Sequence, residues 1–314
     1  MRDCVVMALG GNAILARGEI GTVEEQTLNL ARTARTILEV AAEGTSVVIT
    51  HGNGPQIGAI LIQNEAAKGS VPPMPLDVCG AESQGMLGYL IERALRDVAK
   101  GNDDIKIATI LTQTLVHRDD PDFAAPSKPI GPFYDKGTAS RLMKQQGYKM
   151  IEDSGRGWRR VVPSPSPIKV LEAHAIEKLV GEGYIVIANG GGGIPIIEER
   201  GRMFGVEAVI DKDLSSQKLA TQIHASTLLL LTDVRKVYLN YGQPDQTELD
   251  DLSIEQAHYY LDNGHFHKGS MEPKVRAAVE FMEAGGDLAA IGSIEEGYDV
   301  LKGRAGTRIV SART

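Results

Sequence analysis

The sequence contains little cysteine and no excess of positive charge. Its 314 residues include only two cysteines, Cys4 and Cys79, and their separation does not match the ligand spacing of a metal site. So few cysteines argue against a disulfide-stabilised scaffold and indicate a reducing compartment such as the cytoplasm. The formal net charge of −8 argues against a nucleic-acid-binding protein with a basic surface overall, although it is compatible with a local basic groove.

Long hydrophobic runs are also missing. The N-terminal segment MRDCVVMALGGNA has too short an apolar run for a signal peptide, and no stretch is long enough to span a membrane. We find no solenoid repeat and no low-complexity tract. Hydrophobic residues make up 42% of the chain and charged residues 24%, an ordinary globular composition that suffices for one large α/β domain or two smaller ones.

Apolar segments of strand length alternate with helical patterns. Six such segments do not alternate in polarity, which is typical of strands buried on both faces. They cover residues 4–9, 46–50, 105–111, 184–188, 226–231 and 287–291. Helical patterns cover 22–44, which ends at Gly44, and 55–69, with Pro55 in its first turn. The alternation predicts an α/β fold with a mainly parallel sheet, helical cover and right-handed crossovers.

Residues 117–168 interrupt this alternation. The segment contains half of the chain's 14 prolines and its only tryptophan, Trp158. Long insertions in compact α/β domains often cover a binding site, so one interpretation is a lid. The other interpretation is a surface excursion without a role in function.

Three of the predicted strands run directly into glycine-rich turns. These turns are Gly10-Gly11-Asn12, His51-Gly52-Asn53-Gly54-Pro55 and Asn189 to Pro195. In an open parallel sheet, ligands bind beyond the carboxyl ends of the strands, and glycine lets the backbone N–H groups approach an anion. A single glycine turn would be weak support, but three at three strand ends favour an anion-binding site. His51 suits a general base and a turn-shaping residue equally well.

Several short motifs point to other chemistries but lack the context that these require. The chain has no G-x-x-x-x-G-K-[ST] phosphate loop, and GNGPQIG differs from G-x-G-x-x-G. AESQG resembles a nucleophile elbow, but no strand directly precedes it, so we interpret Ser83 as a polar helix residue. SSQK (215–218) matches S-x-x-K without its companion motifs. The histidines of HFHKG (265–269) lack a third metal ligand, so we expect a loop there and no metal-binding residues.

Three lysines occupy positions that suit phosphoryl transfer, which needs positive charge around the migrating group more than it needs a covalent catalyst. Lys212 follows an apolar run and lies between Asp211 and Asp213. We expect Asp213 to cap the following helix and to orient a lysine. Lys274 lies near a helix N-terminus, where a cation is unfavourable unless an anionic ligand binds. Lys128, in the proline-rich segment, would by itself be an ordinary surface lysine.

Eight segments, taken together, resemble one known family. They are ALGGNAIL, THGNGPQIG, GAESQGMLGYLI, SKPIGPFY, ANGGGGIP, AVIDKDLSSQKLA, LLLLTDV and GSMEPKVRAAVEF. In this order they resemble the carbamate kinases of the amino acid kinase superfamily over essentially the whole chain. HGNGPQIG, VIDKDLSS and MEPKV are the specific part, whereas GGGG and LTDV are shared more loosely with acetylglutamate, aspartate and uridylate kinases.

The resemblance implies an α/β fold, an open three-layer αβα sandwich with a mainly parallel central sheet and a protruding lid subdomain. Residues 1–314 would form a single domain. Its N-terminal half, about 1–205, would bind the acceptor and contain the lid at about 117–168, and its C-terminal half, about 206–314, would bind the nucleotide.

The resemblance also implies roles for individual residues. Lys128, Lys212 and Lys274 would neutralise the migrating phosphoryl group, and Asp213 would order the lysines. The acceptor and the transferring phosphate would be held by backbone N–H groups of Gly10, Gly11, Asn12, Gly52, Asn53 and Gly54. The nucleotide would be bordered by Thr232, Asp233, Val234 and Tyr241, with Asp211 as a weaker candidate. Taken alone, Thr232-Asp233 is an ordinary strand exit, and Tyr241 could instead pack on the surface.

The implied activity is that of a carbamate kinase, a phosphotransferase with a carboxyl-type acceptor that works reversibly between ATP and carbamate, with ATP or ADP and Mg²⁺ as cofactors. In cells that ferment arginine through the arginine deiminase pathway, the reaction runs from ADP and carbamoyl phosphate to ATP. We expect a cytoplasmic homodimer with small-molecule substrates and no nucleic-acid or membrane partner. Two alternatives are another amino acid kinase acting on a carboxylate, and a catalytically inactive nucleotide-binding regulator on the same fold.

Overall fold

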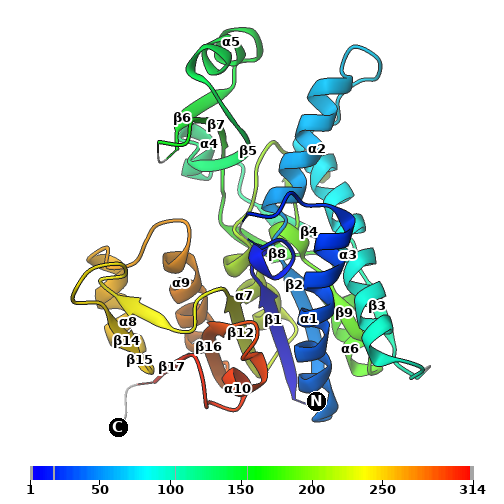
Figure 1. The fold of residues 1–314 in the computed structure, drawn as a ribbon, viewed down its shortest axis with the longest axis vertical. Helices are drawn as coiled ribbons and strands as arrows, with labels where there is room; N and C mark the ends of the chain where they lie inside the picture. The colour runs from blue at the N-terminus through cyan, green and yellow to red at the C-terminus, as the bar shows by residue number, and fades with distance from the viewer. Residues whose placement is uncertain (1–2, 17, 103, 154, 312–314) are drawn as a thin grey trace.

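The computed structural model describes residues 3–16, 18–102, 104–153 and 155–311 (Figure 1). Helices lie on both sides of a central sheet, and a group of short strands and helices projects from one end (Figure 1). In the described ranges we find no helix that combines the length and the apolar character needed to cross a membrane.

Within the described residues, the central sheet has eight strands. They are β1 (Cys4–Leu9), β2 (Ser46–His51), β3 (Ile107–Thr109), β9 (Ile185–Ile187), β12 (Thr227–Thr232), β15 (Asp251–Ser253), β16 (Leu288–Ser293) and β17 (Thr307–Val310). Their order is β15-β17-β16-β12-β1-β2-β9-β3, and only the β16–β17 pair is antiparallel. Because β12, β1, β2 and β9 are parallel neighbours, the turns that follow them lie side by side at one edge of the sheet.

Helices cover both faces of this sheet. They are α1 (Val23–Ala42), α3 (Leu76–Ala99), α6 (Ala173–Gly181), α7 (Lys212–Gln222), α8 (Ile254–Asp262), α9 (Met271–Glu283) and α10 (Gly297–Leu301). In β1, Val5, Met7 and Leu9 pack with α1, α3 and α10, whereas Val6 and Ala8 face the side covered by α6, α7, α8 and α9. The strands are therefore buried on both faces, and the expected three-layer αβα sandwich is confirmed.

All six predicted strands are present, as are the two predicted helices. β3 and β9 are shorter than the segments 105–111 and 184–188, because only their middle residues pair with neighbouring strands. Helix α1 begins after Thr22, which forms a capping box with Glu25. Helix α2 (Gly54–Ala67) carries Pro55 in its first turn. Cys4 and Cys79 are free, buried thiols.

One helix start differs from the prediction. Asp211, not Asp213, caps helix α7, because the Asp211 carboxylate accepts a hydrogen bond of 2.9 Å from the backbone N–H of Asp213. The helix therefore begins at Lys212. This start leaves the Asp213 carboxylate available for the two lysines described below.

Further strands in the described part of the chain form three small sheets. β11 (Arg202–Gly205), β10 (Ile194–Glu199), β4 (Gln113–Val116) and β8 (Pro167–Val170) make a second sheet in that order. β13 (Val237–Leu239) and β14 (Thr247–Leu249) form a hairpin after β12. The projecting group consists of α4 (Pro121–Ala124), β5 (Lys128–Tyr134), α5 (Lys136–Gln146), β6 (Lys149–Glu152) and β7 (Trp158–Val162). Single 3₁₀ turns occur at η1 (Gly11–Ala13) and η2 (Gly190–Gly192).

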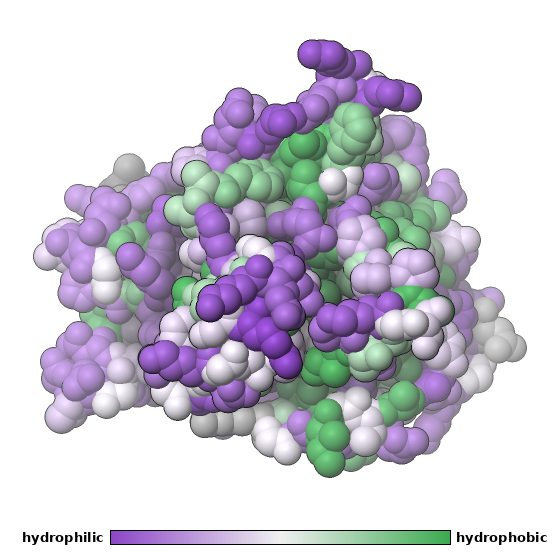
Figure 2. Space-filling model, turned by 90° about the horizontal axis from the view of Figure 1, so that it is seen from above, coloured by the Kyte–Doolittle hydropathy of each residue, from purple (hydrophilic) through white to green (hydrophobic). Residues whose placement is uncertain are grey.

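The projecting subdomain, residues 117–166, joins the body through β4 and β8. Its three strands have the order β5-β7-β6. Ile130 of β5 and Val162 of β7 pack with Ile57 of α2 and Leu76 of α3 in one apolar cluster. Seen from the side of this subdomain, the surface is mainly hydrophilic, with hydrophobic side chains in small separate groups (Figure 2). The apolar base fixes where β5, and hence Lys128, lies above the carboxyl edge of the sheet.

The turn after β9 is buried and requires glycine. Gly193 has φ +88°, and a Cβ atom there would lie 2.0 Å from the Thr114 Oγ1 atom. Gly191 has φ +65°, and a Cβ atom there would lie 2.2 Å from the Asn53 side chain. Both the backbone angle and the close packing exclude a larger residue. The glycine turn predicted at Asn189 to Pro195 is thus packed against the turn that follows β2.

We predict that Gly193→Ala lowers the free energy of unfolding by about 2–6 kcal/mol, because it combines backbone strain with overpacking. The matched control is Gly44→Ala, at φ +77°, where no described residue other than the two chain neighbours has a heavy atom within 4 Å of the added Cβ. That change should cost only about 1–2 kcal/mol. Denaturant unfolding of both variants measures the difference, and equal losses would contradict the close packing of the turn.

Candidate active site

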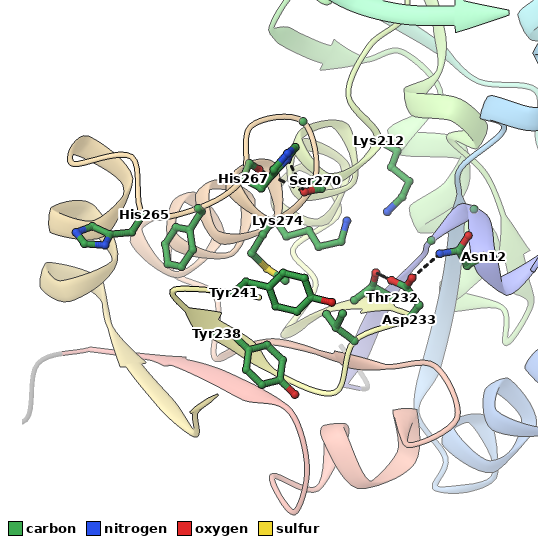
Figure 3. Close-up of a pocket in the computed structure, with 16 residues that line it drawn as sticks. Asn12, Lys212, Thr232, Asp233, Tyr238, Tyr241, His265, His267, Ser270 and Lys274 are labelled. Atoms are coloured by element: carbon green, nitrogen blue, oxygen red, sulfur yellow. Dashed lines mark hydrogen bonds between the residues drawn. The ribbon is translucent and has the colours of Figure 1, made fainter. Parts of the chain in front are cut away.

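One cavity at the carboxyl edge of the sheet has a volume of about 440 Å³ (Figure 3). Its lining includes Thr232, Asp233 and Val234 from the end of β12, and the neighbouring rings of Tyr238 and Tyr241, whose centroids are 5.7 Å apart. The amino groups of Lys212 and Lys274 lie in the same space (Figure 3). Aromatic rings on one part of the wall and cations on another suit a ligand with a flat ring and negative charge.

A second, smaller cavity of about 200 Å³ lies beside the first. Its lining comes from the turn Gly52–Gly54, from Gly191, from Asp211 to Asp213 at the start of α7, and from Lys128 and Arg159 of the projecting subdomain. Lys212, Lys274 and Gly269 line both cavities. The two lysines therefore stand at the boundary between the two ligand spaces.

The two lysines share one carboxylate. Lys212 Nζ lies 2.5 Å from Asp213 Oδ1, and Lys274 Nζ lies 2.8 Å from Asp213 Oδ2. Asp213 itself is 3% exposed. Because one carboxylate serves two ammonium groups, the cluster keeps a net positive charge that faces both cavities.

Burial and mutual attraction set the charges of this cluster. Burial by itself would raise the pKa of Asp213, but the two ammonium groups outweigh it and hold that pKa at about 2. Burial lowers the pKa of Lys212, and Lys274 adds to this lowering while Asp213 opposes it. For Lys274 burial acts in the same direction, but Asp213 outweighs it and the pKa is raised. Asp213 thus remains a carboxylate throughout the neutral range and stays paired with both lysines.

Asp211 connects the projecting subdomain to the same helix start. Lys128 Nζ lies 2.9 Å from Asp211 Oδ2, while Asp211 Oδ1 caps α7. The structure therefore brings Lys128, Lys212 and Lys274 to one small cavity, although 146 positions separate Lys128 from Lys274 in the sequence. Asp211, which the resemblance placed tentatively with the nucleotide, lines the smaller cavity.

The predicted glycine turns divide between the two cavities. Gly52, Asn53 and Gly54 line the smaller one. Gly10, Gly11 and Asn12 line the larger one, beside the residues that follow β12. Asn12 Nδ2 donates a 2.7 Å hydrogen bond to Asp233 (Figure 3). The turns still touch each other, since a Cβ atom on Gly52 would lie 3.3 Å from Gly11 N.

A buried polar network supports the start of α7. Ser216 Oγ donates to the Lys212 carbonyl at 2.6 Å and shares a 2.6 Å hydrogen bond with Thr50 Oγ1. Asn189 Nδ2 donates to Ser215 Oγ at 2.9 Å. Because Thr50 lies near the end of β2 and Asn189 follows β9, the network fixes Lys212 relative to the glycine turns.

The resemblance did not assign Arg159, Gly191, Gly269 or Tyr238 to the site. Gly191 lies in the glycine turn Asn189 to Pro195, which was predicted to contribute to an anion-binding site, so the sequence did indicate this region. Gly269, at φ +78°, ends the HFHKG segment, which forms the expected loop. Arg159 and Tyr238 carry no distinctive motif, and only the folded chain brings them to the cavities.

Two other candidates have structural roles. Ser83 is a buried residue of α3 that donates to the Gly80 carbonyl and accepts a hydrogen bond from Asn53, as expected for a helix residue. His51 is 1% exposed, and its Nδ1 donates to the Gly52 carbonyl at 2.9 Å. Burial lowers the pKa of His51 to about 4. Since His51 lines neither cavity, the structure favours the turn-shaping interpretation over a general base.

Comparison with known proteins shows which protein family this chain is similar to. A model of the amino acid kinase family matches residues 3–293. A carbamate kinase from Thermococcus kodakarensis is 51% identical over 310 residues, covering 98% of each chain. One from Pyrococcus horikoshii is 49% identical, covering 98% of this chain and 99% of that one. The solved carbamate kinase from Giardia lamblia bound to AMP-PNP superimposes with a TM-score of 0.93, at 43% identity and 99% coverage of each chain.

We predict that Asp213→Asn lowers the free energy of unfolding at pH 7 by about 3–5 kcal/mol, because two buried ammonium groups lose their partner. The folded-state pKa of about 2 lies below the ordinary 3.8. The stabilisation from Asp213 is therefore complete above pH 3.8 and is lost as the pH falls toward 2. Between pH 7 and pH 3 the deficit of the variant should shrink by about 1 kcal/mol.

Denaturant unfolding at the two pH values tests this prediction. Asp119→Asn, which removes an exposed carboxylate, is the control and should change stability by no more than about 0.5 kcal/mol at either pH. A deficit for Asp213→Asn that stays constant or grows toward pH 3 would contradict the proposed ion pairs.

Proposed function

Because the chain belongs to the carbamate kinases of the amino acid kinase family, we propose that it transfers a phosphoryl group reversibly between ATP and carbamate. It is accordingly a phosphotransferase with a carboxyl-type acceptor. The observation that carries the proposal is the pair of adjacent cavities that share Lys212 and Lys274. A phosphoryl group passing between a nucleotide and an acceptor must cross such a boundary, and the lysines would neutralise its charge there.

The larger cavity would hold the nucleotide. Tyr238 and Tyr241 offer ring faces for the adenine, and the backbone of Gly10 and Gly11 offers N–H groups for phosphate oxygens. The AMP-PNP complex of the Giardia enzyme supports ATP or ADP as the ligand. Thr232, Asp233 and Val234 would border it.

Magnesium would be held mainly by the nucleotide. The described part of the chain has no cluster of three or more His, Cys, Asp or Glu side chains that could hold a metal. Mg²⁺ usually retains several water ligands and is coordinated by nucleotide phosphates and one or two protein carboxylates, so it does not need such a cluster. Asp233 offers a carboxylate in the larger cavity, where the nucleotide would bind. When bound, the ion would supply further positive charge to the phosphates.

The smaller cavity would hold carbamate or carbamoyl phosphate. Its volume of about 200 Å³ accommodates a small planar anion together with a phosphoryl group. Lys128, which lies on the projecting subdomain, would bind the ligand together with Lys212 and Lys274. The subdomain would act as a lid. Transfer would then be in line between the carbamate oxygen and ADP, without a covalent intermediate on the protein.

The inactive regulator is the weaker candidate. A protein that had lost catalysis would be expected to lose at least one of the three lysines or Asp213, and all four are present and close together. Burying such a charge cluster is unfavourable unless an anionic ligand binds to it.

We propose that the enzyme acts in the cytoplasm, in the arginine deiminase pathway, and in the direction of ATP formation.

We also propose that two copies associate. Val78, Met86 and Tyr89 expose apolar surface along α3, and Met203 and Phe204 do so on β11. The two elements are adjacent, since a Cβ atom on Gly205 would clash with Asp77. β11 is an outer strand of its sheet, so its free edge can pair with the same strand of a second copy.

We predict that the purified protein forms ATP rapidly from ADP, Mg²⁺ and carbamoyl phosphate in a coupled assay. Lys212→Ala should reduce turnover by about 10²–10³-fold, since one electrostatic donor is lost, while the protein remains folded. Lys218→Ala, on the same helix but lining neither cavity, is the control and should retain turnover. Aspartate and acetylglutamate, tested with ATP, should give no product.

The outcomes separate the candidates. Activity on a carboxylate with none on carbamoyl phosphate would retain the fold and replace the substrate. Unchanged turnover in Lys212→Ala would refute the role of the lysines, and inactivity on every substrate would favour the regulator.

A separate prediction concerns assembly. The double variant Met86→Glu, Phe204→Glu should shift the protein from dimer to monomer in sedimentation equilibrium, because it places charges in the apolar patch. Tyr259→Glu changes an exposed aromatic residue on α8 and should leave the dimer intact. A monomeric parent protein, or a variant that stays dimeric, would refute this interface.

A further inference from the structure

We propose that Arg159, on β7 of the projecting subdomain, binds the carbamate moiety of the acceptor and sets the specificity of the smaller cavity. The inference rests on the proposed function and adds a residue to it. Arg159 lines the cavity together with Lys128 and the turn Gly52–Gly54. The subdomain therefore contributes two cations to the acceptor space.

The guanidinium of Arg159 is held in place before any ligand binds. Its Nε donates to the Gly131 carbonyl at 3.2 Å, and its Nη1 donates to Asp153 at 3.1 Å. Its central carbon lies 5.1 Å from the centre of the Phe133 ring, and the side chain is 22% exposed. The planar group has a further nitrogen, Nη2, with two N–H groups that can donate to an anion. Preorganisation of this kind reduces the entropy lost on binding.

The charges of the cavity point to an anionic ligand. Lys128, Arg159, Lys212 and Lys274 are cationic and Asp211 and Asp213 are carboxylates, which leaves a formal charge of +2 among the lining residues. The three lysines are already paired with those two carboxylates. The carboxylate that pairs with Arg159 is Asp153, which does not line the cavity. With Asp153 counted, the four cations still exceed the three carboxylates by one, and Arg159 is paired from outside the cavity.

An arginine and a lysine recognise different groups. The guanidinium fork can bind a planar carboxylate-like group as well as a phosphate, whereas an ammonium group acts as a point charge. Position separates the roles, because Lys212 and Lys274 line both cavities and Arg159 lines only the smaller one. We therefore assign the lysines to the phosphoryl group and Arg159 to the carbamate.

The neighbouring arginine Arg156 provides a matched control. It lies over the same Phe133 ring at 4.7 Å and pairs with the same Asp153 at 3.5 Å, but it is 63% exposed and lines neither cavity. Replacing Arg156 perturbs the surroundings that the two arginines share, without removing the side chain that lines the smaller cavity. A difference between the two variants thus isolates contact with the acceptor.

The test is steady-state kinetics of Arg159→Gln and Arg156→Gln with carbamoyl phosphate and ADP varied separately. We expect Arg159→Gln to raise the KM for carbamoyl phosphate by about 10- to 100-fold, as for a lost hydrogen bond to a charged group, and the KM for ADP by less than about 2-fold. Arg156→Gln should resemble the parent protein. Arg159→Lys should recover part of the loss, and added guanidine should restore part of the activity of Arg159→Ala.

Several results would overturn the inference. These are an unchanged KM for carbamoyl phosphate in Arg159→Gln, an equal rise in both KM values, or an equal effect of Arg156→Gln. Thermal unfolding of each variant shows whether a loss of activity reflects a loss of the fold; if Arg159→Gln is unstable, guanidine rescue of Arg159→Ala decides. If the parent protein itself does not turn over carbamoyl phosphate, the proposed function fails and the inference fails with it.

Discussion

The carboxylate of Asp213, placed between the ammonium groups of Lys212 and Lys274, is the interaction on which the site depends. It joins the first turn of α7 to the first turn of α9 at the carboxyl edge of the sheet. Without the carboxylate, two like charges at the start of two helices would repel each other and the positive helix ends. With it, both lysines are held at the boundary between the two cavities.

This charge cluster needs rigid support from the surrounding backbone. Asp211 caps α7, and the hydroxyl of Ser216 ties the Lys212 carbonyl to the end of β2. The glycine turns contribute in another way, because they let three chain segments approach more closely than side chains would allow. Side-chain positions in the site are thus set by main-chain geometry, as preorganised electrostatic stabilisation requires.

The projecting subdomain is attached to the segment that leads into α7. Lys128 pairs with Asp211, and Arg160 pairs with Glu207 at 2.6 Å. Any movement of the subdomain would therefore act on the residues just before the lysine cluster. An anionic acceptor would compete with Asp211 for Lys128, which gives a physical route from ligand binding to the position of the subdomain.

Much of this protein was determined by local sequence. Aliphatic runs without alternating polarity gave the buried strands, and glycine turns at three strand ends indicated an anion site. The segments around Lys212 and Lys274 resembled one family closely enough to suggest their roles, because a buried charge between apolar residues leaves a clear pattern. Such signals lie within a few residues of each other and need no knowledge of the fold.

Other features were decided only by the tertiary structure. The cap of α7 was assigned to the wrong aspartate, because either residue has a suitable side chain and only the backbone geometry selects Asp211. Arg159 has no motif of its own, and its place in the smaller cavity depends on how β5 and β7 pack over α2. The division of the glycine turns between two cavities likewise follows from strand order. Sequence determined which groups were available for chemistry, whereas contacts between distant segments decided which of them face the same ligand.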